Sequence, residues 1–163
     1  MGKRVLITGA AGNLGGLLAR RLLKDEVLLH LLVHRQDVSP ELKAKDNVNV
    51  FWADLAVRES LGSALDGVDT IVHFAGVLFK HNPEKFLKTT NTLYLLDVAV
   101  QKGVKRVILI SFPHVEGETT PDHPARGRLD GNPVSMHART RLEEERLLFE
   151  YGERRGFEPV ALR

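Results

Sequence analysis

The stretch Thr8-Gly9-Ala10-Ala11-Gly12-Asn13-Leu14-Gly15 decides how this chain folds. It follows an apolar run at residues 5–7 and opens a pattern of leucines at positions 14, 17, 18 and 22, which have the spacing of a helix. The order strand, glycine turn, helix favours phosphate binding, because glycine lets the backbone approach a pyrophosphate and a helix N-terminus offers unpaired N–H groups. A glycine turn that binds no ligand is the alternative interpretation.

Strand and helix patterns alternate along the rest of the chain. We predict strands at residues 4–8, 27–33, 48–52, 70–74, 107–110 and 159–162, and helices at 13–24, 56–65, 83–102 and 135–155. Residues 39–45 are expected to form a short helical turn or loop, and residues 112–134, with four prolines and three glycines, a long loop. This alternation predicts a three-layer, doubly wound parallel α/β sheet (a Rossmann fold) with strand order 3-2-1-4-5-6, in one domain over residues 1–163.

The amino-acid composition limits the classes of protein to which this chain can belong. The hydrophobic fraction of 43% and the charged fraction of 27% are those of an ordinary globular domain, and there is no cysteine for a disulfide or a thiolate nucleophile. The net charge of +2 is spread without a basic block, so no nucleic-acid partner is expected. No apolar run is long enough for a membrane span, and no His or carboxylate spacing fits a metal site. We therefore expect a cytoplasmic protein without a metal.

The spacing Thr-Gly-x-x-Gly-x-x-Gly at the N-terminus resembles the short-chain dehydrogenase/reductase superfamily, in its extended or atypical branch, the NAD(P)-dependent epimerase/dehydratase family. The resemblance runs from Lys3 to Arg163. It implies that NAD(P) lies against the glycine turn, on Gly9, Ala11, Gly12, Asn13, Leu14 and Gly15. Family members carry a further C-terminal segment that builds much of the substrate pocket, so the resemblance implies that the substrate subdomain is missing from these residues.

Selection between the two cofactors is expected at the end of the second strand. An acid there binds the 2′-hydroxyl of NAD, whereas an arginine accommodates the 2′-phosphate of NADP. The strand ends His34-Arg35-Gln36, and Arg35 suits a phosphate dianion. We therefore predict NADP as the preferred cofactor, with NAD as the alternative. The competing interpretation is that Arg35 is a solvated strand end.

Three further positions match the family's cofactor contacts. The resemblance implies that Asp54, followed by Leu55, contacts the adenine amino group, although Asp54 also suits a helix cap. Phe74-Ala75-Gly76 resembles the small-residue turn that closes the fourth strand beside the dinucleotide. Asn91 matches a family asparagine that steadies the active-site helix. His73, inside the fourth strand, is interpreted as a hydrogen-bonded core histidine.

The catalytic positions depart from the family pattern. The family uses a Ser or Thr after the fifth strand and a Tyr followed four residues later by Lys. Here the hydroxyl position falls on Phe112, with Ser111 one place early, and His137 and Arg141 stand for the Tyr and the Lys. His137 could move the proton, since imidazole titrates near neutrality, and Arg141 could still bind ribose and phosphate although it cannot lose its proton. In the other interpretations the ordinary reaction is lost while dinucleotide binding is kept, or His137 is merely a solvated histidine at a helix start.

Together these features predict an oxidoreductase or epimerase with an atypical active site: His137, Arg141 and Ser111 act in hydride transfer on a small polar carbonyl or a nucleotide-sugar-like small-molecule substrate. The alternative is a catalytically silent dinucleotide-binding regulator or redox-sensing interaction module. The resemblance also implies a homodimer through helices 83–102 and 135–155, whose apolar residues extend beyond one face.

Overall fold

The computed structural model describes residues 2–76 and 89–163. Its centre is a six-stranded sheet in the order β3-β2-β1-β4-β5-β6, in which every neighbouring pair is parallel. The strands are β1 (Lys3–Thr8), β2 (Val27–Val33), β3 (Val48–Trp52), β4 (Thr70–His73), β5 (Arg106–Ile110) and β6 (Glu158–Leu162). The predicted fold and strand order are therefore confirmed.

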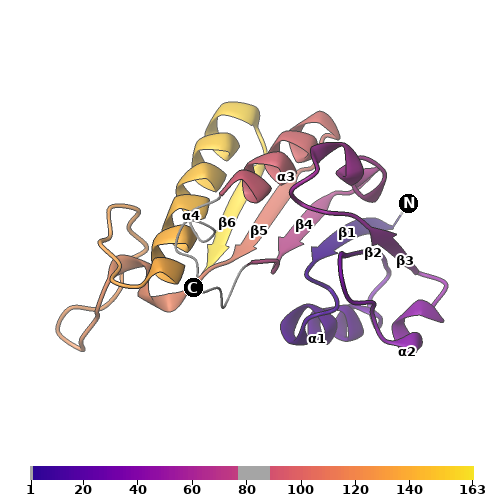
Figure 1. Cartoon of the computed structure of the whole chain (residues 1–163), viewed down its shortest axis with the longest axis horizontal. Coiled ribbons are helices and arrows are strands. Elements are labelled where there is room, and N and C mark those ends of the chain that lie inside the picture. Colours follow the sequence, from indigo (N-terminus) through magenta and orange to yellow (C-terminus); the bar gives the residue numbers. More distant parts are fainter. Residues whose placement is uncertain (1, 77–88) are drawn as a thin grey trace.

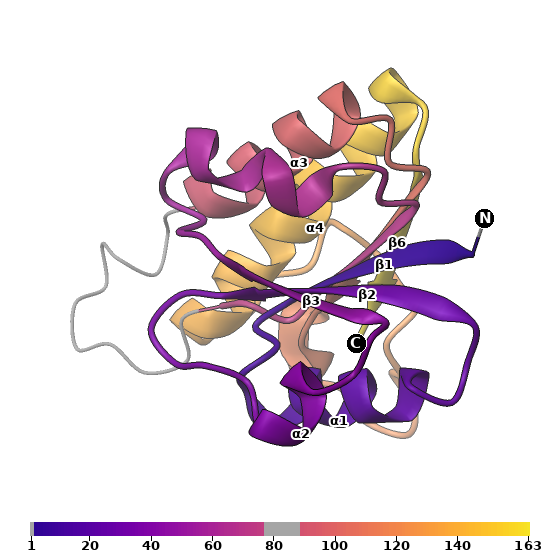
Figure 2. The same ribbon diagram turned by 90° about the vertical axis from the view of Figure 1, so that its right-hand side faces the viewer.

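Helices cover both faces of this sheet, and Figures 1 and 2 show the resulting three layers. The helices α1 (Asn13–Leu22) and α2 (Pro40–Lys43) lie on one face, and α3 (Thr90–Gln101) and α4 (Met136–Arg155) lie side by side on the other. The homodimer expected through α3 and α4 stays a prediction. Within residues 2–76 and 89–163, no helix combines the length and the apolar composition that a bilayer crossing requires.

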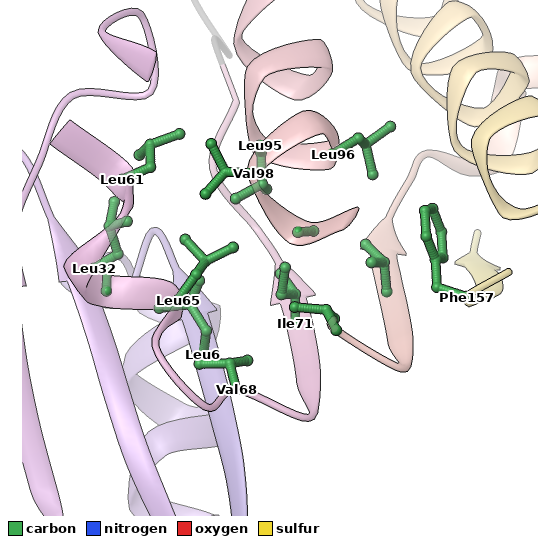
Figure 3. Close-up of a cluster of buried hydrophobic side chains, with 14 of the residues drawn as sticks. Leu6, Leu32, Leu61, Leu65, Val68, Ile71, Leu95, Leu96, Val98 and Phe157 are labelled. Atoms are coloured by element: carbon green, nitrogen blue, oxygen red, sulfur yellow. The ribbon is translucent and has the colours of Figure 1, made fainter. Parts of the chain in front are cut away.

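Two apolar clusters form the core, one on each face of the sheet. Leu6 and Ile7 are neighbours in β1 whose side chains point to opposite faces, and both are fully buried. Leu6 belongs to the cluster under α3 and α4, which Figure 3 shows with Ile71 and Leu95. Ile7 packs instead with the buried residues of α1 and α2. Burying each such side chain stabilises the fold by about 1.5–3 kcal/mol, which explains the apolar run at residues 5–7 of β1.

The helix predicted at residues 56–65 is wrong: the chain forms two 3₁₀ turns there, Arg58–Leu61 and Ser63–Leu65. The Ser60 hydroxyl donates to the carbonyls of Asp54 and Val57 at 3.0 and 2.7 Å. Such bonds from a side chain to the nearby backbone compete with the helical ladder.

The ends of the other predicted helices agree more closely with the structure. Ser135 caps α4 as its position suggests, because its hydroxyl accepts the Ala138 N–H at 3.1 Å. Gly156, at φ +80°, ends the same helix. The predicted helix 83–102 ends within one residue of Gln101, and its predicted start lies outside the described residues. α1 stops at Leu22, two residues early.

Candidate functional site

The glycine turn lies at the carboxyl end of β1, between β2 and β4, where the strand order reverses. In open α/β sheets this is the place where ligands bind. Gly9 has φ +68°, and a Cβ there would lie 3.0 Å from the backbone nitrogen of Ala75. The turn closes with the Gly12 N–H donating to the Gly9 carbonyl at 2.9 Å. Only glycine satisfies both the backbone angle and the close approach at position 9.

The start of α1 fits a pyrophosphate. A Cβ on Gly15 would lie 2.4 Å from the Gly9 carbonyl oxygen, so the helix packs directly on the turn. α1 has no side-chain cap and no acidic residue in its first turn, and Gly12, Asn13 and Leu14 are exposed beside it. The N-terminal N–H groups and the positive end of the helix dipole therefore face solvent, as an anion site requires.

A cavity of about 200 Å³ adjoins this turn. Residues of the turn, of α1 and of the segment around α2 line it: Ala10, Ala11, Gly12, Asn13, Gly16, Arg20, Val38, Ser39 and Leu42. Arg20 and Ser39 are absent from the residues predicted for the site. Nη2 of Arg20 lies 3.5 Å from Oγ of Ser39. Arg20 lies four residues after Gly16, which places both on the same face of α1. This spacing is the sequence signal that indicates Arg20 as a lining residue.

The expected adenosine contacts lie at the ends of β2 and β3. Arg35 is exposed, and among the described residues none forms an ion pair or hydrogen bond with its side chain. Oδ1 of Asp54 accepts the Ala56 N–H at 2.9 Å, and Oδ2 lies 3.4 Å from Nε2 of His34. The bond to Ala56 closes a local turn and does not cap a helix, because the first 3₁₀ turn begins only at Arg58. The contact of Asp54 with adenine, and that of the half-buried Leu55, stay predictions.

His73 is a buried core histidine, as predicted. Its Nδ1 lies 2.6 Å from the Thr8 hydroxyl and its Nε2 lies 3.4 Å from the Thr92 hydroxyl. Burial, together with the nearby positive charge of Arg141, lowers the pKa of His73 to about 3. The imidazole is therefore neutral at physiological pH and serves structure rather than proton transfer.

The turn after β4 is held tightly. Phe74 is half-buried, and the Ala75 N–H donates to the Thr8 hydroxyl at 3.2 Å. The Ala75 carbonyl accepts from Nη2 of Arg141 at 3.5 Å. A Cβ on Gly76 would lie 1.8 Å from that same nitrogen. Gly76 is therefore required to make room for Arg141, a role that the family resemblance did not suggest. Asn91 is half-buried in the first turn of α3.

Three aromatic rings lie together at the positions where the family resemblance led us to expect catalytic residues. The Phe112 ring lies edge-to-face with His137, at a centroid distance of 4.8 Å, and 5.3 Å from the His114 ring. The Ser111 hydroxyl is buried and has no hydrogen-bond partner among the described residues, while its N–H donates to the Leu162 carbonyl at 2.7 Å. A buried, unsatisfied hydroxyl at the carboxyl end of β5 suits a polar ligand group.

Arg141 is buried and ion-paired. Its Nη1 lies 2.8 Å from Oε2 of Glu144, and both side chains are almost inaccessible to solvent. Burial raises the pKa of Glu144, against the lowering effect of the Arg141 charge. The expected role of Arg141 in binding ribose and phosphate stays a prediction. Glu144 was not predicted, although an acid three residues after an arginine on a helix is a recognisable pairing signal.

A metal centre has no candidate among residues 2–76 and 89–163, because no three His, Asp or Glu side chains gather there. The site thus consists of a backbone cradle at the glycine turn and a set of side chains at the ends of β4, β5 and α4. The cradle and the orphaned Ser111 hydroxyl fit a dinucleotide.

Known proteins share the sequence pattern and the fold of this chain. Uronate dehydrogenase of Pseudomonas putida is 32% identical over 163 residues, which are 98% of this chain and 59% of that protein. A point mutant of Agrobacterium tumefaciens uronate dehydrogenase, complexed with NAD, superposes with a TM-score of 0.77 at 28% identity, over 96% of this chain and 58% of the other. Thermus thermophilus UDP-glucose 4-epimerase in complex with NAD shares the fold, with a TM-score of 0.80 at 24% identity, over 98% and 54% of the two chains.

The chain spans about three fifths of the length of the uronate dehydrogenases that it matches. The sequence model of the NAD dependent epimerase/dehydratase family covers residues 5–163. That match takes in the glycine turn, all the expected cofactor contacts and the altered catalytic positions. The chain therefore belongs to the NAD dependent epimerase/dehydratase family.

Proposed function

We propose that this chain is the cofactor-binding part of an NAD(P)-dependent oxidoreductase or epimerase that acts on a small polar carbonyl of a sugar or a nucleotide sugar. The observation that carries the proposal is the backbone cradle of Gly9, Gly12 and Gly15 at the start of α1. The similarity to uronate dehydrogenases supports a sugar-derived substrate and NAD as a cofactor.

His137 is the proposed proton donor and acceptor. It lies one residue inside α4, half-buried, and its ring contacts Phe112 at the end of β5. The bound nicotinamide supplies or accepts the hydride. His137 moves the proton at the substrate oxygen as the hydride arrives or leaves, which is the role that imidazole most often has in catalysis. Ser111 offers its unsatisfied hydroxyl to the same ligand.

A catalytically silent dinucleotide-binding module is the second candidate. Two observations favour it: a phenyl ring stands where the family has a hydroxyl, and the Arg141 guanidinium is already paired with Glu144. In this case the cradle binds NAD(P) and the altered positions support no turnover. Both candidates share cofactor binding and differ only in chemistry.

We propose that the protein prefers NADP over NAD, and the argument for this preference rests on Arg35 alone. The exposed guanidinium is available for the 2′-phosphate, since no described residue occupies it. The two solved relatives were complexed with NAD, which supports NAD as a second cofactor.

The test is a titration of the protein with NADH and NADPH, followed by nicotinamide fluorescence, and repeated with His137→Phe. Binding of either cofactor supports the cradle, and binding of neither contradicts the proposed function. Turnover with uronates and other sugar aldehydes or keto sugars is then assayed. In an enzyme, His137→Phe lowers turnover by about 10²–10⁴-fold and leaves the cofactor Kd unchanged. Cofactor binding without any turnover supports the silent module.

A further inference from the structure

A set of buried hydrogen bonds starts and ends at Ala75, the residue between the glycine turn and α4. The Ala75 N–H donates to the Thr8 hydroxyl at 3.2 Å. His73 is neutral because burial lowers its pKa to about 3. The single proton of the Thr92 hydroxyl goes to Glu144, so Thr92 accepts from Nε2–H of His73 at 3.4 Å, and Nδ1 accepts the Thr8 hydroxyl proton at 2.6 Å.

The second half of the set runs through α3 and α4 and returns to the same residue. Thr92 donates to Oε1 of Glu144 at 2.8 Å, and Arg141 donates to Oε2 at 2.8 Å. Arg141 also donates to the Ala75 carbonyl at 3.5 Å. The Glu144 carboxylate, which accepts from both Thr92 and Arg141, closes the ring. We call this set the Ala75 circuit; besides Ala75, its side chains are those of Thr8, His73, Thr92, Glu144 and Arg141.

Burial makes each bond of the Ala75 circuit matter. All five of these residues are at most 6% exposed, so water has little access to a broken bond. A buried donor or acceptor left without its partner bears the full cost of desolvation, and a buried ion that loses its counter-ion bears more. Removing a single polar atom from the Ala75 circuit is therefore expected to destabilise the whole set of hydrogen bonds.

The place of the Ala75 circuit relates it to the cofactor. The Ala75 backbone lies against Gly9, as the 3.0 Å distance to a Cβ built on Gly9 shows. On its other side Arg141 lies so close that a Cβ on Gly76 would be 1.8 Å from its guanidinium. Arg141 is also four residues after His137, on the same face of α4.

We infer that Glu144 and Thr92 are positioning residues, which hold Arg141 against the Ala75 carbonyl and thereby fix the turn 74–76 beside the glycine turn. Arg141 then acts on the cofactor site through the backbone that it supports, and not as a free cation. The consequence for cofactor affinity rests on the proposed function, whereas the coupling of α4 to Ala75 is independent of that function.

The test compares three protein variants. Two of them alter the hydrogen bond from Thr92 to Glu144 and the third removes the hydrogen bond from Tyr151 to Asp97; both bonds join α3 and α4. Thr92→Val keeps the shape and removes the hydroxyl, and Thr92→Ser restores the hydroxyl. Tyr151→Phe removes the bond from the Tyr151 hydroxyl to Oδ1 of Asp97, at 2.9 Å, outside the Ala75 circuit, and is the matched control. Amide hydrogen exchange at Ala75, relative to Ile71 in the preceding strand β4, and the Kd of NADH are measured for each.

We expect Thr92→Val to speed exchange at Ala75 relative to Ile71, and to raise the Kd of NADH, each about tenfold, as for one lost buried hydrogen bond. Thr92→Ser returns both to within about twofold, and Tyr151→Phe changes neither. If Thr92→Val does not fold, Glu144→Gln is measured in its place with the same expectation. A glutamine amide has one oxygen acceptor and one NH₂ donor, so it cannot accept from Thr92 at one atom and from Arg141 at the other as the carboxylate does.

Unchanged relative exchange at Ala75, or an equal change in Tyr151→Phe, overturns the inference. Faster exchange with an unchanged Kd overturns its consequence for the cofactor. If the unaltered protein binds neither NADH nor NADPH, the proposed function fails, while exchange at Ala75 still tests the coupling of α4 to that turn.

Discussion

The two ends of the candidate site are built in different ways. At the end of β1, Gly9, Gly12 and Gly15 form a cradle from backbone atoms, and the family spacing is kept. At the end of β5 and the start of α4, side chains would do the chemistry, and the expectation from the family resemblance is that Phe112 and His137 stand at its catalytic positions. An added Cβ would lie within 3.0 Å of backbone atoms at Gly9 and Gly15, whereas the side-chain end consists of packed rings, with Phe112 edge-to-face on His137.

This contrast teaches which part of a function is constrained by geometry. A backbone cradle depends on φ angles and close approaches, which leave glycine as the only choice. A side-chain site can exchange its groups provided that each buried polar atom finds a partner. The Arg141–Glu144 pair shows this, because the Glu144 carboxylate compensates the buried Arg141 cation. The predictions below test each end.

The largest effect is expected at the side-chain end. Arg141→Leu leaves the Glu144 carboxylate buried without its counter-ion, and we expect it to lower the free energy of unfolding by about 3–5 kcal/mol. The pKa of Glu144, already raised by burial, should rise further because the lowering effect of Arg141 is lost. Urea unfolding at pH 7 measures the change.

Two controls define the cause. Arg154→Ala removes an exposed pair with Glu150 on the same helix and should cost less than about 0.5 kcal/mol. The double variant Arg141→Leu/Glu144→Leu removes both charges and should recover most of the lost stability. If the double variant is as unstable as Arg141→Leu, packing and not charge explains the loss.

The backbone end is tested by a matched pair of glycines. Gly15→Ala places a Cβ 2.4 Å from the Gly9 carbonyl, and we expect it to destabilise the fold by about 1–3 kcal/mol and to abolish detectable NADH binding. Gly62→Ala is the control, since its Cβ meets no atom within 4 Å and its φ of −53° suits alanine. It should leave NADH binding unchanged and change stability by less than about 1 kcal/mol, in the favourable direction. Equal effects of the two variants on NADH binding would contradict the role given to the turn.

Between the two ends, His73 should make stability depend on pH. Its folded pKa of about 3 lies below the ordinary value of about 6.5 for histidine, so the unfolded chain takes up a proton first as pH falls. Stability is therefore lost from about pH 6.5 downwards, and between pH 7 and pH 5 His73 accounts for about 2 kcal/mol. The raised pKa of Glu144 acts with the opposite sign.

The difference between the unaltered protein and His73→Asn isolates this contribution, because Glu144 is present in both. We expect the free energy of unfolding of His73→Asn to fall less between pH 7 and pH 5, by about 2 kcal/mol. The measurement is urea unfolding at both pH values. An identical pH dependence in the two proteins would mean that His73 is protonated in the fold as easily as in the unfolded chain.

The sequence predicts the backbone end better than the side-chain end. Alternating strands and helices and the glycine spacing were enough for the sheet order and for the turn, because both follow from local patterns. The prediction for residues 56–65 is wrong because the apolar pattern does not show local side-chain bonds, such as those of the Ser60 hydroxyl, which compete with the helical ladder. The Ala75 circuit could not be predicted, since Thr8, His73, Thr92 and Glu144 are far apart in the sequence and meet only in the folded chain.

The smallest effect is expected at Arg35, which follows β2 and whose side chain forms no hydrogen bond or ion pair with any of the described residues. Arg35→Ser removes one charge-assisted contact with a 2′-phosphate, so the Kd of NADPH should rise about tenfold while that of NADH stays the same. Arg21→Ser, on α1 and paired with Asp25, removes an equal charge elsewhere and should move neither Kd. Equal loss for both cofactors in Arg35→Ser would show a general electrostatic attraction. Selection of NADP by the backbone end would then need another residue, and Arg20, which lines the neighbouring cavity, is the next to substitute.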